Sequence, residues 1–124
     1  MADSNDLSHE GIATKLATQY AVLVRACEML PIPIALPEPN AFMSNVEMVP
    51  AVRRVADIAD AQPIPEEIQS HLFTAAIFWL TGMDLLGMLV TNEWNEIRAF
   101  QALAALSMSG SALADLGVWV LEQE

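Results

Sequence analysis

A carboxylate inside an apolar stretch is the first feature of this chain that could do chemistry. Asp84 lies within residues 72–90, which are otherwise almost entirely apolar. Desolvation favours the protonated form of such a carboxyl group, so Asp84 could act as a general acid or base near neutral pH. We therefore take Asp84 as the leading catalytic candidate. The structural alternative is an aspartate that is hydrogen-bonded in the core or at a subunit interface.

Two basic groups complete the set of catalytic candidates. His71 is one of two histidines and stands near the start of the apolar stretch, so it would be the proton shuttle of a catalytic site. Arg98 is the only lysine or arginine in residues 63–124. Its guanidinium could pair with Asp84 or with Asp115, a second acid in apolar surroundings, or it could hold a carboxylate or phosphate of a ligand. The structural alternatives are a surface histidine and an internal ion pair.

Aromatic and methionine side chains could line an apolar pocket for a ligand. The candidates for this pocket are Tyr20, Trp79, Met83, Met88, Trp94 and Asp115. Together with the three catalytic candidates they would form a cofactor-free enzyme that moves protons in an isomerisation, a cyclisation or an elimination. Alternatively, the same side chains belong to the hydrophobic core or to an interface.

The motifs of common metal and cofactor sites are missing from the sequence. Cys27 is the only cysteine, which excludes a disulfide within the chain and a zinc cluster of cysteines. The sequence also contains no HExxH motif, no nucleotide-binding glycine motif and no GxSxG motif. We therefore expect neither a metal nor a cofactor.

Prolines and apolar spacing divide the chain into helices. Apolar residues recur at three- and four-residue steps from Ile12 to Leu30, which predicts an amphipathic first helix. Residues 31–40 hold four of the seven prolines and predict an extended connection. Further helices are predicted at 41–49, 51–61, 65–90, 93–108 and 111–122, with a break within 107–111. No alternating strand pattern occurs, so the expected fold class is all-α, a compact bundle of five or six helices in a single domain, residues 1–124.

Charge and hydropathy together point to self-association. The chain has 124 residues, of which 54% are hydrophobic, and its formal charge is −11, which argues against binding to nucleic acid or anionic lipid. The helix at about 65–90 is apolar all round and is predicted to be the buried central helix, and most of residues 99–121 are equally apolar. Because so short a chain can hardly bury two such helices, a homodimer is the preferred interpretation. The alternatives are a monomer with an apolar cavity and a membrane hairpin, although the aspartates within both segments and the scarcity of flanking bases argue against a hairpin.

These observations predict a small acidic helical protein that acts as a protein-interaction or assembly module. Its expected partners are a second copy and a basic protein, or else an apolar small molecule. The alternative function is the cofactor-free enzyme with a buried Asp84. A third hypothesis is mimicry of DNA, for which the acidic residues lack a duplex-like spacing. The acidic N-terminus lacks the pattern of a signal peptide, which favours the cytoplasm, and the alanine-rich, lysine-poor composition favours a bacterial source.

Overall fold

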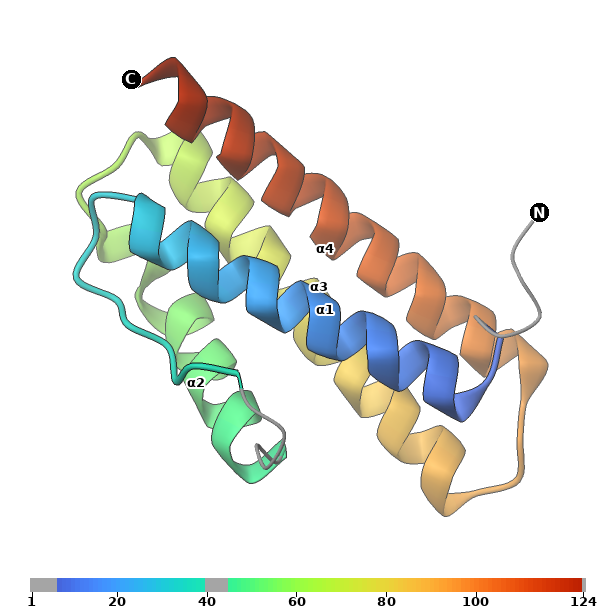
Figure 1. Cartoon of the computed structure of the whole chain (residues 1–124). Coiled ribbons are helices and arrows are strands. Elements are labelled where there is room, and N and C mark those ends of the chain that lie inside the picture. The colour runs from blue at the N-terminus through green and yellow to red at the C-terminus, as the bar shows by residue number, and fades with distance from the viewer. Residues whose placement is uncertain (1–6, 40–44, 124) are drawn as a thin grey trace.

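The computed structural model describes residues 7–39 and 45–123. Within these ranges the chain forms four α-helices, one short 3-10 helix and no strand, so the predicted all-α class is confirmed. The elements are α1 (His9–Met29), α2 (Asn45–Ile58), η1 (Ala59–Ala61), α3 (Glu66–Thr91) and α4 (Glu96–Glu122). Figure 1 shows that α1, α3 and α4 run side by side along the length of the molecule, with α2 at one end.

Local sequence signals account for the ends of the helices. The Ser8 hydroxyl caps α1, because it accepts a hydrogen bond of 2.9 Å from the backbone N–H of Gly11. At its other end α1 stops before the proline-rich connection, of which residues 31–39 form neither helix nor strand, as predicted. The Asn95 side chain accepts a hydrogen bond of 3.0 Å from the backbone N–H of Arg98 and so starts α4.

The predicted count of five or six helices is wrong, because α4 continues through its run of small residues. The break expected within 107–111 does not occur. The hydroxyl of Ser109 donates a hydrogen bond of 2.8 Å to the backbone oxygen of Ala75 in α3. A Cβ atom added to Gly110 would lie 3.4 Å from the side-chain amide of Gln19 in α1. The small side chains therefore let the neighbouring helices pack closely against α4, and they do not end it.

The two short helices predicted at 41–49 and 51–61 are one helix, α2, followed by η1. α2 continues through Pro50, whose fixed φ is compatible with a helix and which removes only one backbone donor. The predicted start near Ala41 lies outside the described residues.

α3 and α4 form a long antiparallel hairpin, and α1 lies along one side of it (Figure 1). The indole N–H of Trp79 in α3 donates a hydrogen bond of 2.9 Å to the backbone oxygen of Leu16 in α1. The Gln19 amide of α1 donates a hydrogen bond of 2.9 Å to the backbone oxygen of Leu106 in α4. α2 packs chiefly against α3. The bundle therefore holds α3 and α4 from one side, and no helix of the described residues covers the other side of the hairpin.

α3 is central, because it packs against α1, α2, η1 and α4, but it is not buried on every side as the sequence predicts. Leu72, Ala76 and Trp79 on one face are fully buried, whereas Thr81 and Asp84 on the far side of the helix are exposed. By length and composition α3 and α4 could each cross a membrane, with mean hydropathies of 1.7 and 1.4, yet only 33% and 39% of their most apolar 18-residue windows are buried. An all-apolar helix is buried on every side only where enough chain surrounds it, and here α1 and α2 reach one side only.

Candidate functional site

The side of the α3–α4 hairpin that α1 and α2 leave uncovered is the most distinctive surface of the structure, and we call it the outer face. Trp79 and Gly110, which face α1, lie on the opposite side of their helices. The residues of the outer face recur at three- and four-residue steps, which places them on one side of each helix. They are Phe73, Ile77, Thr81, Asp84 and Met88 of α3, with Phe73 at the edge beside α2, and Ile97, Phe100, Ala104, Met108, Ser111, Asp115 and Val118 of α4.

Large hydrophobic side chains of the outer face are widely exposed to solvent. Their exposed fractions run from 44% at Phe73 to 72% at Ile97. The other four are Met88, Phe100, Met108 and Val118. An aromatic side chain offers roughly 150–250 Å² for burial and the aliphatic ones offer somewhat less, so each of the six leaves on the order of 100 Å² uncovered, or about 600 Å² in all. Monomeric soluble proteins rarely expose a contiguous apolar patch of more than a few hundred Å², so this surface is expected to have a partner.

The middle of the outer face is also nearly free of charge, with Asp84 on α3 and Asp115 near the end of α4 as its acids. Asp84 is the only charged residue between His71 and Thr91, and α4 carries no charge between Arg98 and Asp115. The acids that give the chain its formal charge of −11 lie mostly elsewhere. Because like charges repel, this is the side on which another copy of the chain can approach with the least electrostatic cost.

Two of the three catalytic candidates, Asp84 and Arg98, line none of the cavities described below. Asp84 is exposed on the outer face and makes no hydrogen bond or ion pair within the described part of the chain. The prediction of a buried carboxyl group is therefore wrong for the single chain: the surrounding segment is apolar, but this side of the helix meets solvent. Arg98 is half-buried near the start of α4, and its guanidinium pairs with neither Asp84 nor Asp115.

The third catalytic candidate, His71, lies beside two acids near the start of α3. Its Nδ1 atom is 3.8 Å from Oδ2 of Asp115 in α4, and its Nε2 atom is 4.0 Å from Oε1 of Glu67 one turn earlier. A protonated His71 would form one ion pair with Asp115 across the contact between α3 and α4 and another with Glu67 within α3. Within the described residues, no group of three histidine, cysteine or acidic side chains could hold a metal ion. These residues border an open cavity of about 300 Å³, whose other lining residues are Ile68, Val118, Trp119 and Glu122.

Tyr20 and Trp79, two of the predicted pocket residues, belong to the core. Both side chains are buried, and their ring centroids lie 5.9 Å apart. The Tyr20 hydroxyl donates a hydrogen bond of 2.7 Å to the backbone oxygen of Pro37, which ties the extended connection to α1. Burial raises the pKa of this hydroxyl, and nearby glutamates add to the effect. Both aromatic residues therefore have structural partners in place of a ligand.

The remaining pocket candidates lie apart from one another. Met83 is buried, Met88 lies on the outer face, and Asp115 borders the cavity near the start of α3. Trp94, in the turn between α3 and α4, packs edge-on against the ring of His9 with centroids 4.9 Å apart. The predicted ligand pocket is therefore not assembled in the single chain, and the enzyme alternative gains no support from it.

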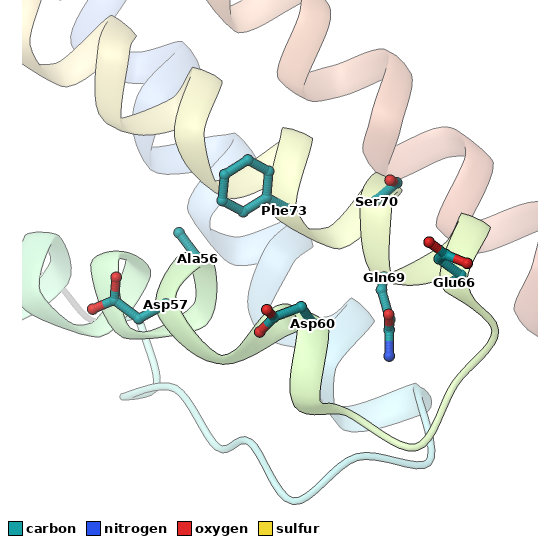
Figure 2. Close-up of a pocket in the computed structure, with 7 residues that line it drawn as sticks. All are labelled: Ala56, Asp57, Asp60, Glu66, Gln69, Ser70 and Phe73. Atoms are coloured by element: carbon teal, nitrogen blue, oxygen red, sulfur yellow. The ribbon is translucent and has the colours of Figure 1, made fainter.

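Two further cavities lie where the sequence marks no site. The larger, of about 500 Å³, opens between α2, η1 and α3, and Figure 2 shows carboxylates from these elements around it. Its lining residues are Ala56, Asp57, Asp60, Glu66, Gln69, Ser70 and Phe73. The smaller, of about 280 Å³, lies between the extended connection and α2. Each cavity joins segments that only the packing of the bundle brings together, so no local sequence signal could have located it.

Comparison with known proteins assigns no function, because no protein-family model, no curated protein and no solved structure matches this chain. The function is therefore inferred from the geometry of the structure. The outer face is the feature that most needs a partner, since its apolar side chains are exposed on two long helices.

Proposed function

We propose that this protein is an assembly module that pairs with a second copy of itself through the outer face. The observation that carries the proposal is the exposure of two apolar helices, since no more than 39% of the most apolar window of α3 or α4 is buried in the single chain. Removing such a surface from water is the main favourable term in protein association. The enzyme alternative has no comparable support, because Asp84 is exposed outside the cavities.

The area of the outer face is sufficient for a dimer. Its six large hydrophobic side chains supply about 600 Å², and their polar neighbours bring the surface towards the roughly 800 Å² per partner of a standard interface. At about 25 cal/mol per Å², covering 600 Å² corresponds to about 15 kcal/mol of gross hydrophobic free energy for one protomer. The second protomer contributes the same amount, and this gross gain is set against the lost translational and rotational freedom, about 4–15 kcal/mol, the ordering of interface side chains and the desolvation of polar groups.

A second copy suits the outer face better than a lipid bilayer does. Asp84 lies well inside α3 on the exposed side, where lipid would impose a high desolvation cost on its carboxylate. In a protein interface the same carboxylate can stay hydrated at the edge or accept hydrogen bonds from polar side chains of the partner. Arg98 is the only lysine or arginine of α3 and α4, so anionic headgroups would find little positive charge there.

The direct test places a charge in the middle of the outer face. Met108 is 51% exposed on this face and Val22 is 46% exposed on α1, so Met108→Glu and Val22→Glu form a matched pair. Sedimentation velocity at about 1 to 100 µM should show a dimer for the wild type and for Val22→Glu, and a monomer for Met108→Glu. Circular dichroism would confirm that each variant keeps its helices.

Three results would contradict the proposal. A wild type that stays monomeric over this range would leave the outer face without a second copy, and equal dissociation of the two variants would place the interface elsewhere. A wild type that floats as a monomer with zwitterionic vesicles would identify lipid as the occupant instead.

A further inference from the structure

A small groove separates the extended connection from α2, and its described lining combines apolar side chains with exposed polar atoms of one arginine and of the backbone. The groove measures about 280 Å³. It is more enclosed than the cavity of about 500 Å³ between α2, η1 and α3, which we call the acidic cavity because Asp57, Asp60 and Glu66 line it. Figure 1 shows the extended connection running past α2 at this end of the bundle. The lining residues are Pro33, Ile34, Ala35, Leu36, Ala51, Arg54 and Ile58.

Arg54 is the only charged residue of the groove, and its charge is unpaired. Its side chain is exposed, and within the described part of the chain it forms no ion pair or hydrogen bond. In a protein with sixteen acids and five bases, a guanidinium without a carboxylate partner is available for an external one. A guanidinium binds a carboxylate through two parallel hydrogen bonds, which favours a planar carboxylate over other small anions.

The backbone of the groove wall offers further donors. The N–H groups of Ile34, Ala35 and Leu36 donate to no acceptor within the described residues. The segment is nevertheless held in place, because the Tyr20 hydroxyl binds the backbone oxygen of Pro37 directly after it. The segment therefore combines a fixed backbone with N–H groups that have no acceptor within the described residues.

We infer that this groove binds a small monocarboxylate with an unbranched apolar tail, with its carboxylate on Arg54 and its tail along Ile34 and Ile58. At about 30 Å³ per non-hydrogen atom, 280 Å³ holds a ligand of about nine such atoms, which corresponds to a carboxylate of seven or eight carbons. The groove is separate from the outer face, so this inference does not depend on self-association.

The test uses sodium octanoate as the probe and the neighbouring arginine as the control. Arg53 is also exposed on α2 but lines none of the described cavities, so Arg53→Gln and Arg54→Gln remove the same charge. In amide-resolved NMR titrations of the wild type, octanoate should shift Ile34 to Leu36, Ala51 and Ile58. Arg54→Gln should weaken binding at least tenfold, Arg53→Gln should leave it unchanged, and octan-1-ol should bind at least tenfold more weakly than octanoate.

Each contrary outcome would overturn the inference. Equal loss in the two arginine variants would mean that net charge, and not the groove, attracts the anion. Equal binding of octanol and octanoate would remove the role of the guanidinium, and shifts confined to the outer face would place the ligand on the wrong surface. Met108→Glu, designed to remain monomeric, should bind octanoate as the wild type does, so failure of the dimer and failure of this site give different results.

Discussion

Replacing Gly82 by alanine should destabilise the protein, whereas the same replacement at Gly87 should stabilise it. A Cβ atom at Gly82 would lie 2.8 Å from Cδ2 and 3.0 Å from Cγ of Leu106, a buried side chain with little room to move. Overpacking of this kind costs about 1–3 kcal/mol. At Gly87 the added Cβ meets nothing within 4 Å. Both variants gain about 1 kcal/mol of helix propensity, so the steric term alone separates their free energies of unfolding, by about 2 kcal/mol.

Thermal unfolding followed by circular dichroism measures this difference directly. With an unfolding entropy of about 2.1 cal/mol/K per residue, 2 kcal/mol corresponds to a difference of about 8 °C between the two melting temperatures in a chain of 124 residues. Both variants should be compared in the Met108→Glu background at one protein concentration, because self-association would otherwise change the apparent stability. Gly117→Ala is a second control, since its Cβ also meets nothing within 4 Å.

Equal shifts of the melting temperature in Gly82→Ala and Gly87→Ala would contradict the expected clash between a Cβ atom at Gly82 and Leu106. That result would mean that α3 and α4 do not approach each other at Gly82. The outer face is defined by the same helix contact, so the proposed dimer would lose its structural basis as well.

Two further perturbations test the core and the extended connection. Tyr20→Phe removes the hydroxyl that binds the backbone oxygen of Pro37 at 2.7 Å, so it should lower the free energy of unfolding by about 1 kcal/mol and speed protease cleavage within residues 31–39. Burial raises the pKa of Cys27 from 9.0 to about 12, so iodoacetamide at pH 8 should modify this thiol only in unfolded protein. Between pH 9 and 12 the unfolded chain releases the thiol proton that the native state retains, so stability should fall with rising pH, and denaturant titrations of Cys27→Ala should show a smaller fall.

The sequence predicts well those helix boundaries that depend on neighbouring residues. The extended connection over 31–39 and the end of α1 follow from the prolines, because a proline cannot donate to the helix ladder. The break predicted within 107–111 is wrong because the same small residues serve either to end a helix or to bring helices together. The deciding contact joins Ser109 to Ala75, and no local pattern predicts a partner so far away in the chain.

Periodicity identifies the members of the outer face but not its exposure. The spacing places Phe73, Asp84 and Met88 on one side of the long helix, and the structure keeps them together on the exposed side. When every side of a helix is apolar, the pattern does not show which side its neighbours cover. The exposure of Asp84 could therefore not be predicted from the sequence. His71 and Asp115 were both candidates from the sequence, but their distance of 3.8 Å follows only from the antiparallel packing of α3 and α4.

Charge and apolar surface occupy different parts of this molecule, and the effect of salt distinguishes which of them a partner uses. Asp57, Asp60 and Glu66 surround the cavity beside α2, whereas the outer face carries little charge. Two copies with a formal charge of −11 each repel at a distance, and salt screens that repulsion over a length of about 10 Å at 0.1 M while leaving apolar contact intact. Pairing through the outer face should therefore tighten as ionic strength rises. Binding of a basic protein to the acidic cavity should weaken under the same change, because there the screened force is attraction. The sign of the salt dependence of Kd thus assigns the occupied surface, and a dimer that weakens in salt would exclude the outer face as its interface.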